Sequence, residues 1–249
     1  DLLVECRELV VKLLQQDPNS YNGHRLMGQI ALVEMDFDQA VTELTTAYKI
    51  QSKPELAGSL FQALVADKRP ADAEKLADEV IAKNKTYATM YDLLYAQYMR
   101  TNQQDQAEKV LKLKVASNGA DTNALMQLAA YYYYVKRPSD MEAVIKQVTD
   151  EKRFPDGHLL AGDFYLFRVR DFELAREQYE AGEKSQPKDK VAYQKRLVEL
   201  MASNGQSQDA GRLLETFLAH NPKDENAIAL RAAIELQTGN AQQIKQAAI

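Results

Sequence analysis

The sequence has no tryptophan, one cysteine, 10 glycines and 7 prolines among its 249 residues. The single Cys6 excludes an intramolecular disulfide but does not identify a compartment, because secreted proteins can also lack disulfides. No run reaches the roughly 18 apolar residues that a membrane-spanning helix needs. Long alternating β-branched runs are also absent, so strands have little support. Leu, Ala, Gln, Glu and Lys dominate instead, which favours helices.

Charge of one sign is not concentrated anywhere along the chain. The formal net charge is −5, and 27% of the residues are charged while 45% are hydrophobic. This is the composition of an ordinary folded protein rather than a disordered one. A mildly acidic chain without a Lys/Arg cluster is a poor candidate for binding a phosphate backbone. We therefore expect no nucleic-acid partner and no membrane span.

Residues with the spacing of a chemical site are also missing. The three histidines, His24, His158 and His220, lie far apart, and none has a His or Cys neighbour at zinc-ligand spacing. His24 and His158 each follow a glycine, and we interpret them as packing or helix-start residues. No phosphate-binding loop, dinucleotide fingerprint or nucleophile elbow occurs. The sequence predicts no catalytic site, no metal site and no cofactor.

What the sequence does contain is a period. A small or medium residue recurs in similar contexts, such as FDQAVTEL and QDQAEKVL, at steps of 33, 34, 34, 34 and 35 residues. An apolar residue follows each one four positions later, on the same face of a helix. The six register positions and their partners are Ala40 with Leu44, Ala73 with Ala77, Ala107 with Leu111, Met141 with Ile145, Ala175 with Tyr179, and Ala210 with Leu214.

A second amphipathic pattern precedes each register position by about a dozen residues, so the unit is helix, tight turn, helix, short loop. With its period of about 34 residues, the chain resembles the tetratricopeptide repeat family in a degenerate, bacterial-type form. The positions that carry the resemblance are the small Gly28, the turn residues Asp36-Phe37, Asp171-Phe172, Gly205 and Gly239, the early alanines of the second helices, and Pro18, Pro187 and Pro222.

The chain departs from the family pattern in three ways. The family's tryptophan position holds other residues, four middle units lack the terminal proline, and one extra residue lies between Gly162 and Ala175. Related helical-hairpin families therefore remain possible.

The resemblance implies an all-α fold, a right-handed α-α superhelix of about six to seven hairpins in a single array over residues 1–249. We expect a half repeat at 1–18, with Cys6 at the buried small-residue site, and a continuation of the array beyond this sequence. Localisation stays open between cytoplasm and bacterial envelope. The expected repeats are 21–53, 54–87, 88–121, 122–154, 155–189 and 190–223, followed by a frayed repeat at 224–249.

The first helices of such an array line a concave groove. Within the tyrosine run 131–134, the register places Tyr132 in the core and Tyr133 and Tyr134 on the groove side. Either all four tyrosines fill gaps between units, or two of them form an aromatic platform for a partner. The predicted lining is Asn22, Arg25, Gln29, Gln62, Asp92, Met99, Arg100, Asn123, Met126, Gln127, Tyr133, Tyr134, Leu166, Phe167, Lys195, Arg196 and Glu199.

The function predicted from these patterns is a protein–protein interaction scaffold that binds a peptide segment or partner protein in its groove. The alternative is an accessory array that positions an enzymatic or membrane-anchored domain elsewhere in a longer chain. Glycan or small-ligand binding by the aromatic groove is a weaker third possibility. The partner, the pathway and the oligomeric state are not specified by the sequence.

Overall fold

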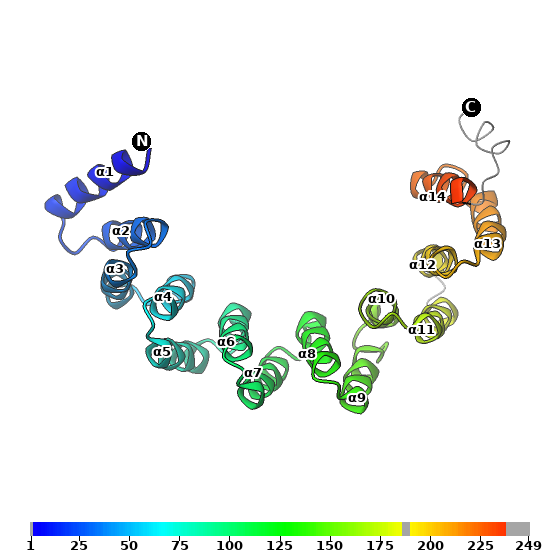
Figure 1. The fold of residues 1–249 in the computed structure, drawn as a ribbon, viewed down its shortest axis with the longest axis horizontal. Coiled ribbons are helices and arrows are strands. Elements are labelled where there is room, and N and C mark those ends of the chain that lie inside the picture. The colour runs from blue at the N-terminus through cyan, green and yellow to red at the C-terminus, as the bar shows by residue number, and fades with distance from the viewer. Residues whose placement is uncertain (1, 186–189, 238–249) are drawn as a thin grey trace. The chain divides into compact units, whose positions relative to one another are not determined.

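The computed structural model describes residues 2–185 and 190–237, and in these ranges the protein is all-α (Figure 1). The chain divides into two compact units, residues 1–119 and 120–249. Unit 1 contains α1 (Leu2–Gln16), α2 (Tyr21–Val33), α3 (Phe37–Ile50), α4 (Pro54–Ala66), α5 (Pro70–Lys83), α6 (Ala88–Arg100) and α7 (Gln104–Ser117). Unit 2 contains α8 (Thr122–Tyr134), α9 (Pro138–Val148), α10 (Gly157–Asp163), a π-helix η1 (Phe164–Val169), α11 (Phe172–Ser185), α12 (Lys190–Ser203), α13 (Ser207–His220) and α14 (Glu225–Gln237).

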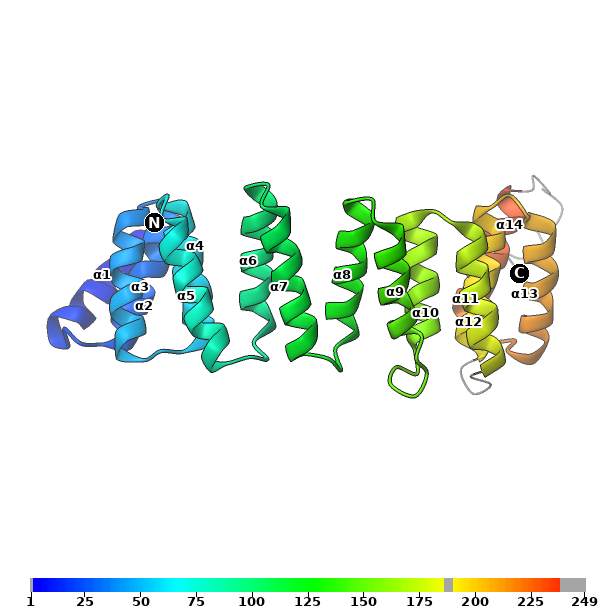
Figure 2. The same cartoon turned by 90° about the horizontal axis from the view of Figure 1, so that it is seen from below.

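The helices pair into hairpins whose two members lie side by side (Figure 2). In unit 1 the pairs are α2 with α3, α4 with α5 and α6 with α7; in unit 2 they are α8 with α9, α10 and η1 with α11, and α12 with α13. The predicted all-α hairpin fold is confirmed. Pro187, Gly239 and the second half of the predicted last repeat lie outside the described residues.

Local sequence explains where the helices begin. The side chains of Ser20, Asp36 and Asp171 accept hydrogen bonds from backbone N–H groups three residues later, at 3.2, 3.1 and 3.0 Å. Such caps satisfy donors that the first helical turn leaves unpaired. Proline at the start of α4, α5 and α9 suits the same position, because its missing N–H has no partner there.

The turn inside every hairpin is closed by one residue in the left-handed backbone region. In unit 2, for example, Lys136 has φ 58° and the N–H of Arg137 donates to the carbonyl of Tyr132 at 2.9 Å. This is the Schellman arrangement that ends a helix. The left-handed residue precedes each register position by five residues, so the turns repeat with the sequence period. These residues are Met35, Lys68, Asn102, Lys136, Arg170 and Gly205.

The residues that recur with the sequence period form the core. All six register positions are buried, with at most 4% of their surface exposed, and so are the six partners four residues later. Glycine makes room where the partner is large. A Cβ added at Gly28 would lie 2.6 Å from Leu44, and one at Gly162 would lie 2.2 Å from the ring of Tyr179. First and second helices therefore approach closely because a small residue on one faces a large residue on the other.

The prediction that Cys6 is buried is wrong. Cys6 is exposed on α1, which packs on α2 through Val10 and Leu14. Its counterpart Ala40 is fully buried on α3, which pairs with the preceding helix α2. None of the helices in the described ranges combines the length and apolar character needed to cross a bilayer.

Candidate interaction surface

In unit 1 a hollow of about 320 Å³ lies between the first helices α4 and α6. Two predicted lining residues, Gln62 and Arg100, border it, and Arg100 donates to the buried Gln97 at 2.5 Å. Its remaining walls come from residues that were not predicted: Phe61, Val65, Ala66, Leu93 and Ala96. The hollow is therefore mainly apolar, with Gln62, Gln97 and Arg100 as its polar groups.

The other predicted residues of unit 1 are accessible but lie outside that hollow. Arg25 and Gln29 are joined along α2 by a hydrogen bond of 3.1 Å. Asp92 on α6 accepts from Lys114 on α7 at 2.6 Å, and Lys114 is only 5% exposed. Asp92 is therefore engaged by its own hairpin. Met99 is half-buried.

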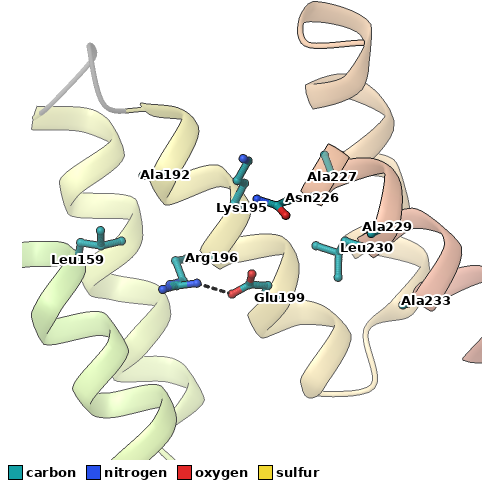
Figure 3. Close-up of a pocket in the computed structure, with 10 residues that line it drawn as sticks. All are labelled: Leu159, Ala192, Lys195, Arg196, Glu199, Asn226, Ala227, Ala229, Leu230 and Ala233. Atoms are coloured by element: carbon teal, nitrogen blue, oxygen red, sulfur yellow. Dashed lines mark hydrogen bonds and ion pairs between the residues drawn. The ribbon is translucent and has the colours of Figure 1, made fainter. Parts of the chain in front are cut away.

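In unit 2 a larger hollow of about 650 Å³ opens over three consecutive first helices, α10, α12 and α14 (Figure 3). The predicted Lys195, Arg196 and Glu199 line it from α12. Small and aliphatic residues make up the rest of the wall: Leu159, Ala192, Ala227, Ala229, Leu230 and Ala233, with Asn226 as a further polar group.

Both cations of this hollow are already paired. Lys195 contacts the carboxylate of Asp224 at 2.6 Å, and this bond, with backbone N–H groups, lowers the pKa of Asp224. Arg196 donates to Asp163 at 2.8 and 3.1 Å and to Glu199 at 2.8 Å. The hollow therefore presents neutralised charge around an apolar floor.

Asp163 is a residue of this surface that was not predicted. Besides Arg196, it accepts from the hydroxyl of Tyr179 at 2.7 Å. Burial raises the pKa of the Tyr179 hydroxyl, and the hydrogen bond to Asp163 raises it further. Because Tyr179 is fully buried and packs on Gly162, Asp163 ties the core of the hairpin to Arg196 on the next first helix.

The extra residue of the fifth repeat is accommodated by the π-helix η1. The backbone N–H of Asp171 donates to the carbonyl six residues back, at Tyr165, whereas the equivalent bonds in the other hairpins span five residues. A π-turn rotates the following side chains relative to an α-helix. The prediction that Leu166 lines the groove is therefore wrong: Leu166 is 2% exposed, while Phe167 is 55% exposed.

The tyrosine run divides between core and surface. Tyr131 and Tyr132 are buried, while Tyr133 and Tyr134 are 40% and 64% exposed. The four tyrosines therefore do not all fill gaps in the core. The Tyr133 ring lies 6.4 Å from that of Phe164, edge to face. The neighbouring predicted residues Met126 and Gln127 are half-buried.

Solved structures share the fold of the chain, although no protein-family model and no curated relative matches the sequence. The C-terminal part of a tetratricopeptide repeat-containing protein from Cytophaga hutchinsonii matches with a TM-score of 0.54 at 17% identity, over 92% of this chain and 94% of that one. The chain has the tetratricopeptide-repeat fold. Yeast Tom70 matches with a TM-score of 0.51 at 14% identity, over 98% of this chain and 53% of Tom70.

The tetratricopeptide register explains which lining residues were missed. Ala229, Leu230 and Ala233 lie 34 residues after Lys195, Arg196 and Glu199. Continuing the count by one repeat would have found them. Asp163 was missed for another reason, because its place depends on where η1 absorbs the extra residue.

Two of the three histidines, His24 and His158, lie near helix starts, as predicted, while His220 ends α13. His24 is the fourth residue of α2 and His158 the second of α10. The Nδ1 atom of His158 lies 3.0 Å from Gln178, and Nε2 lies 3.3 Å from Glu151. In the described ranges, no three His, Cys, Asp or Glu side chains cluster as metal ligands.

Proposed function

We propose that this tetratricopeptide protein is a non-enzymatic interaction scaffold that binds a peptide segment of a partner protein on its first helices. The observation that carries the proposal is the hollow of unit 2, which spans three successive first helices. An extended segment can place successive side chains along such a row of helices. Concave, mainly apolar sites with a few polar groups are the usual form of ligand sites.

The chemistry of the hollow favours apolar side chains in the partner. The alanines of α12 and α14 leave space, while Leu159 and Leu230 offer aliphatic contact. Lys195 and Arg196 already have carboxylate partners, so an acidic tail would have to compete with internal ion pairs. In the same unit, Tyr133, Tyr134 and Phe167 add exposed aromatic surface. These features support a peptide with apolar or aromatic residues over a charged tail.

The test is a variant that fills the hollow without removing any contact. Peptides are first selected from a displayed random library, and their affinities are measured by fluorescence polarisation. Ala229→Glu places a charge among apolar walls, so it is expected to weaken binding by about tenfold or more. Ala229 is exposed, so the variant should retain the fold.

Ala143→Glu is the matched control, because Ala143 is an exposed alanine on the second helix α9 of the same unit. It should leave affinity unchanged. Equal losses in both variants, or no loss in Ala229→Glu, would count against binding at this hollow. Circular dichroism of both variants checks that helix content is unchanged.

A further inference from the structure

His24 joins three segments of unit 1. Its Nε2 lies 2.9 Å from the carbonyl oxygen of Pro18, in the loop after α1, and its Nδ1 lies 2.6 Å from the carboxylate of Glu43 on α3. A carbonyl oxygen accepts hydrogen bonds but cannot donate them, and the same is true of a carboxylate. A neutral imidazole has only one N–H, so both bonds form together only when the ring is protonated.

The charges around the imidazole favour its protonated form. Burial lowers the pKa of His24, but hydrogen bonds to Glu43 and Pro18 and the charges of Glu43 and Asp17 outweigh it and raise the pKa above 6.5. The arginines of α1 and α2 have other partners. Arg25 donates to Gln29 on the same helix, and Arg7 of α1 pairs with Glu34 at the far end of α2.

Besides His24, α1 is held by Arg7, which pairs with Glu34 and donates to Gln39 on α3 at 3.3 Å, and by a small apolar cluster. The cluster between α1 and α2 contains three buried residues, Val10, Met27 and Ile30, with Leu3, Leu14 and Leu26 at its edge. Leu14 sits against Gly23, where a Cβ would approach within 2.6 Å. Elements with few buried apolar contacts open locally before the rest of a structure does. Because the apolar contacts are few, the docking of α1 depends on its polar links, of which the His24 link is one.

We propose that His24 is a pH-sensitive latch that fastens α1 to the first hairpin when the imidazole is protonated and loosens it when the proton leaves. Pro18 and Asp17 belong to the loop that moves with α1, whereas Glu43 stays with α3. When α1 undocks, His24 therefore loses the hydrogen bond to Pro18 and the nearby charge of Asp17, both of which favour the protonated imidazole. By linkage, proton binding and α1 docking strengthen each other.

The direction with pH follows from the raised pKa of His24. The latch contributes fully below about pH 6.5, the ordinary histidine pKa, and its contribution is lost as pH rises through the higher pKa of the docked state. Docking of α1 should thus weaken by about threefold to tenfold between about pH 5.5 and about pH 8.5.

A thiol at position 10 measures this opening. Because Cys6 is the only cysteine, the variant Cys6→Ser, Val10→Cys carries one thiol, at a site that is 6% exposed. Its rate of maleimide labelling is divided by that of the exposed Cys6 in the parent chain at each pH, which removes the effect of thiol ionisation. The corrected rate is expected to rise by about threefold to tenfold between about pH 5.5 and about pH 8.5.

Three variants in this background decide the proposal. His24→Gln and Glu43→Gln should abolish the pH dependence, the second because a neutral imidazole can accept from the new side-chain amide while donating to Pro18. His158→Gln, which alters a histidine in unit 2, should leave the pH dependence intact. A corrected rate that does not change with pH, or a pH dependence that survives in His24→Gln, would overturn the latch.

Discussion

Replacing Gly162 with alanine is expected to destabilise the hairpin formed by α10, η1 and α11 by about 2–3 kcal/mol. The added Cβ would lie 2.2 Å from the ring of Tyr179, which is fully buried and cannot swing into solvent. The neighbouring backbone must shift to relieve this overlap. Hydrogen exchange of α10 and α11 amides, followed by mass spectrometry, measures the free energy of opening of this hairpin.

Two further variants separate this overlap from a general effect of alanine. Gly211 lies in α13, where a Cβ would meet nothing within 4 Å, so Gly211→Ala should stabilise the chain by up to about 1 kcal/mol. The combination Gly162→Ala with Tyr179→Ile copies the pair Ala129 and Ile145 of the preceding repeat. It should cost less than the two single changes added together. Strict additivity would contradict the close approach of the two side chains.

Asp163→Ala is expected to destabilise the same hairpin by about 2 kcal/mol. The change leaves the buried hydroxyl of Tyr179 without an acceptor and removes the contact between Asp163 and Arg196 that joins neighbouring first helices. Asp163 is 29% exposed at its side chain, so water compensates for part of the lost ion pair. The same hydrogen-exchange measurement, extended to α12, reports the effect.

Tyr179→Phe provides the comparison for Asp163→Ala. It removes the hydroxyl donor together with its need for a partner, so it should cost less than losing the acceptor. Asp163→Asn retains an acceptor and should fall between the wild type and Asp163→Ala. If Tyr179→Phe proved the most damaging of the three, the role assigned to Asp163 would be wrong.

The hairpin fold was predictable because the same requirement recurs in each repeat. Two helices can approach closely only if small and large residues alternate at fixed positions, and the spacing of Ala40, Ala73 and Ala107 records this directly. Burial of the register residues follows from that local pattern. No residue outside the repeat is needed to explain it.

The predictions for Leu166 and Cys6 were wrong because the burial of these side chains depends on more than their position in the repeat. The extra residue before Ala175 is visible in the sequence, but counting cannot say which turn absorbs it. Because η1 does so, Leu166 turns into the core and Asp163 reaches Arg196. Cys6 follows the register too, yet its exposure depends on which helices lie beside α1.

The lining of the hollows was predicted only in part. Register counting placed Lys195, Arg196 and Glu199 correctly at the hollow of unit 2. The alanines that create the space, such as Ala229 and Ala233, lie at the same register one repeat later, beyond the point where the predicted lining ends. Their importance comes from the volume they leave empty, which only the packed helices define.

The central claim, that the first helices bind a partner peptide, is tested most directly by mapping where a selected peptide lies. A peptide carrying a photoreactive benzophenone is bound, irradiated and located by mass spectrometry of the cross-linked fragments. Cross-links on α10, α12 and α14, bordering the hollow of unit 2, are the predicted result. Cross-links confined to the second helices α9, α11 and α13 would contradict it.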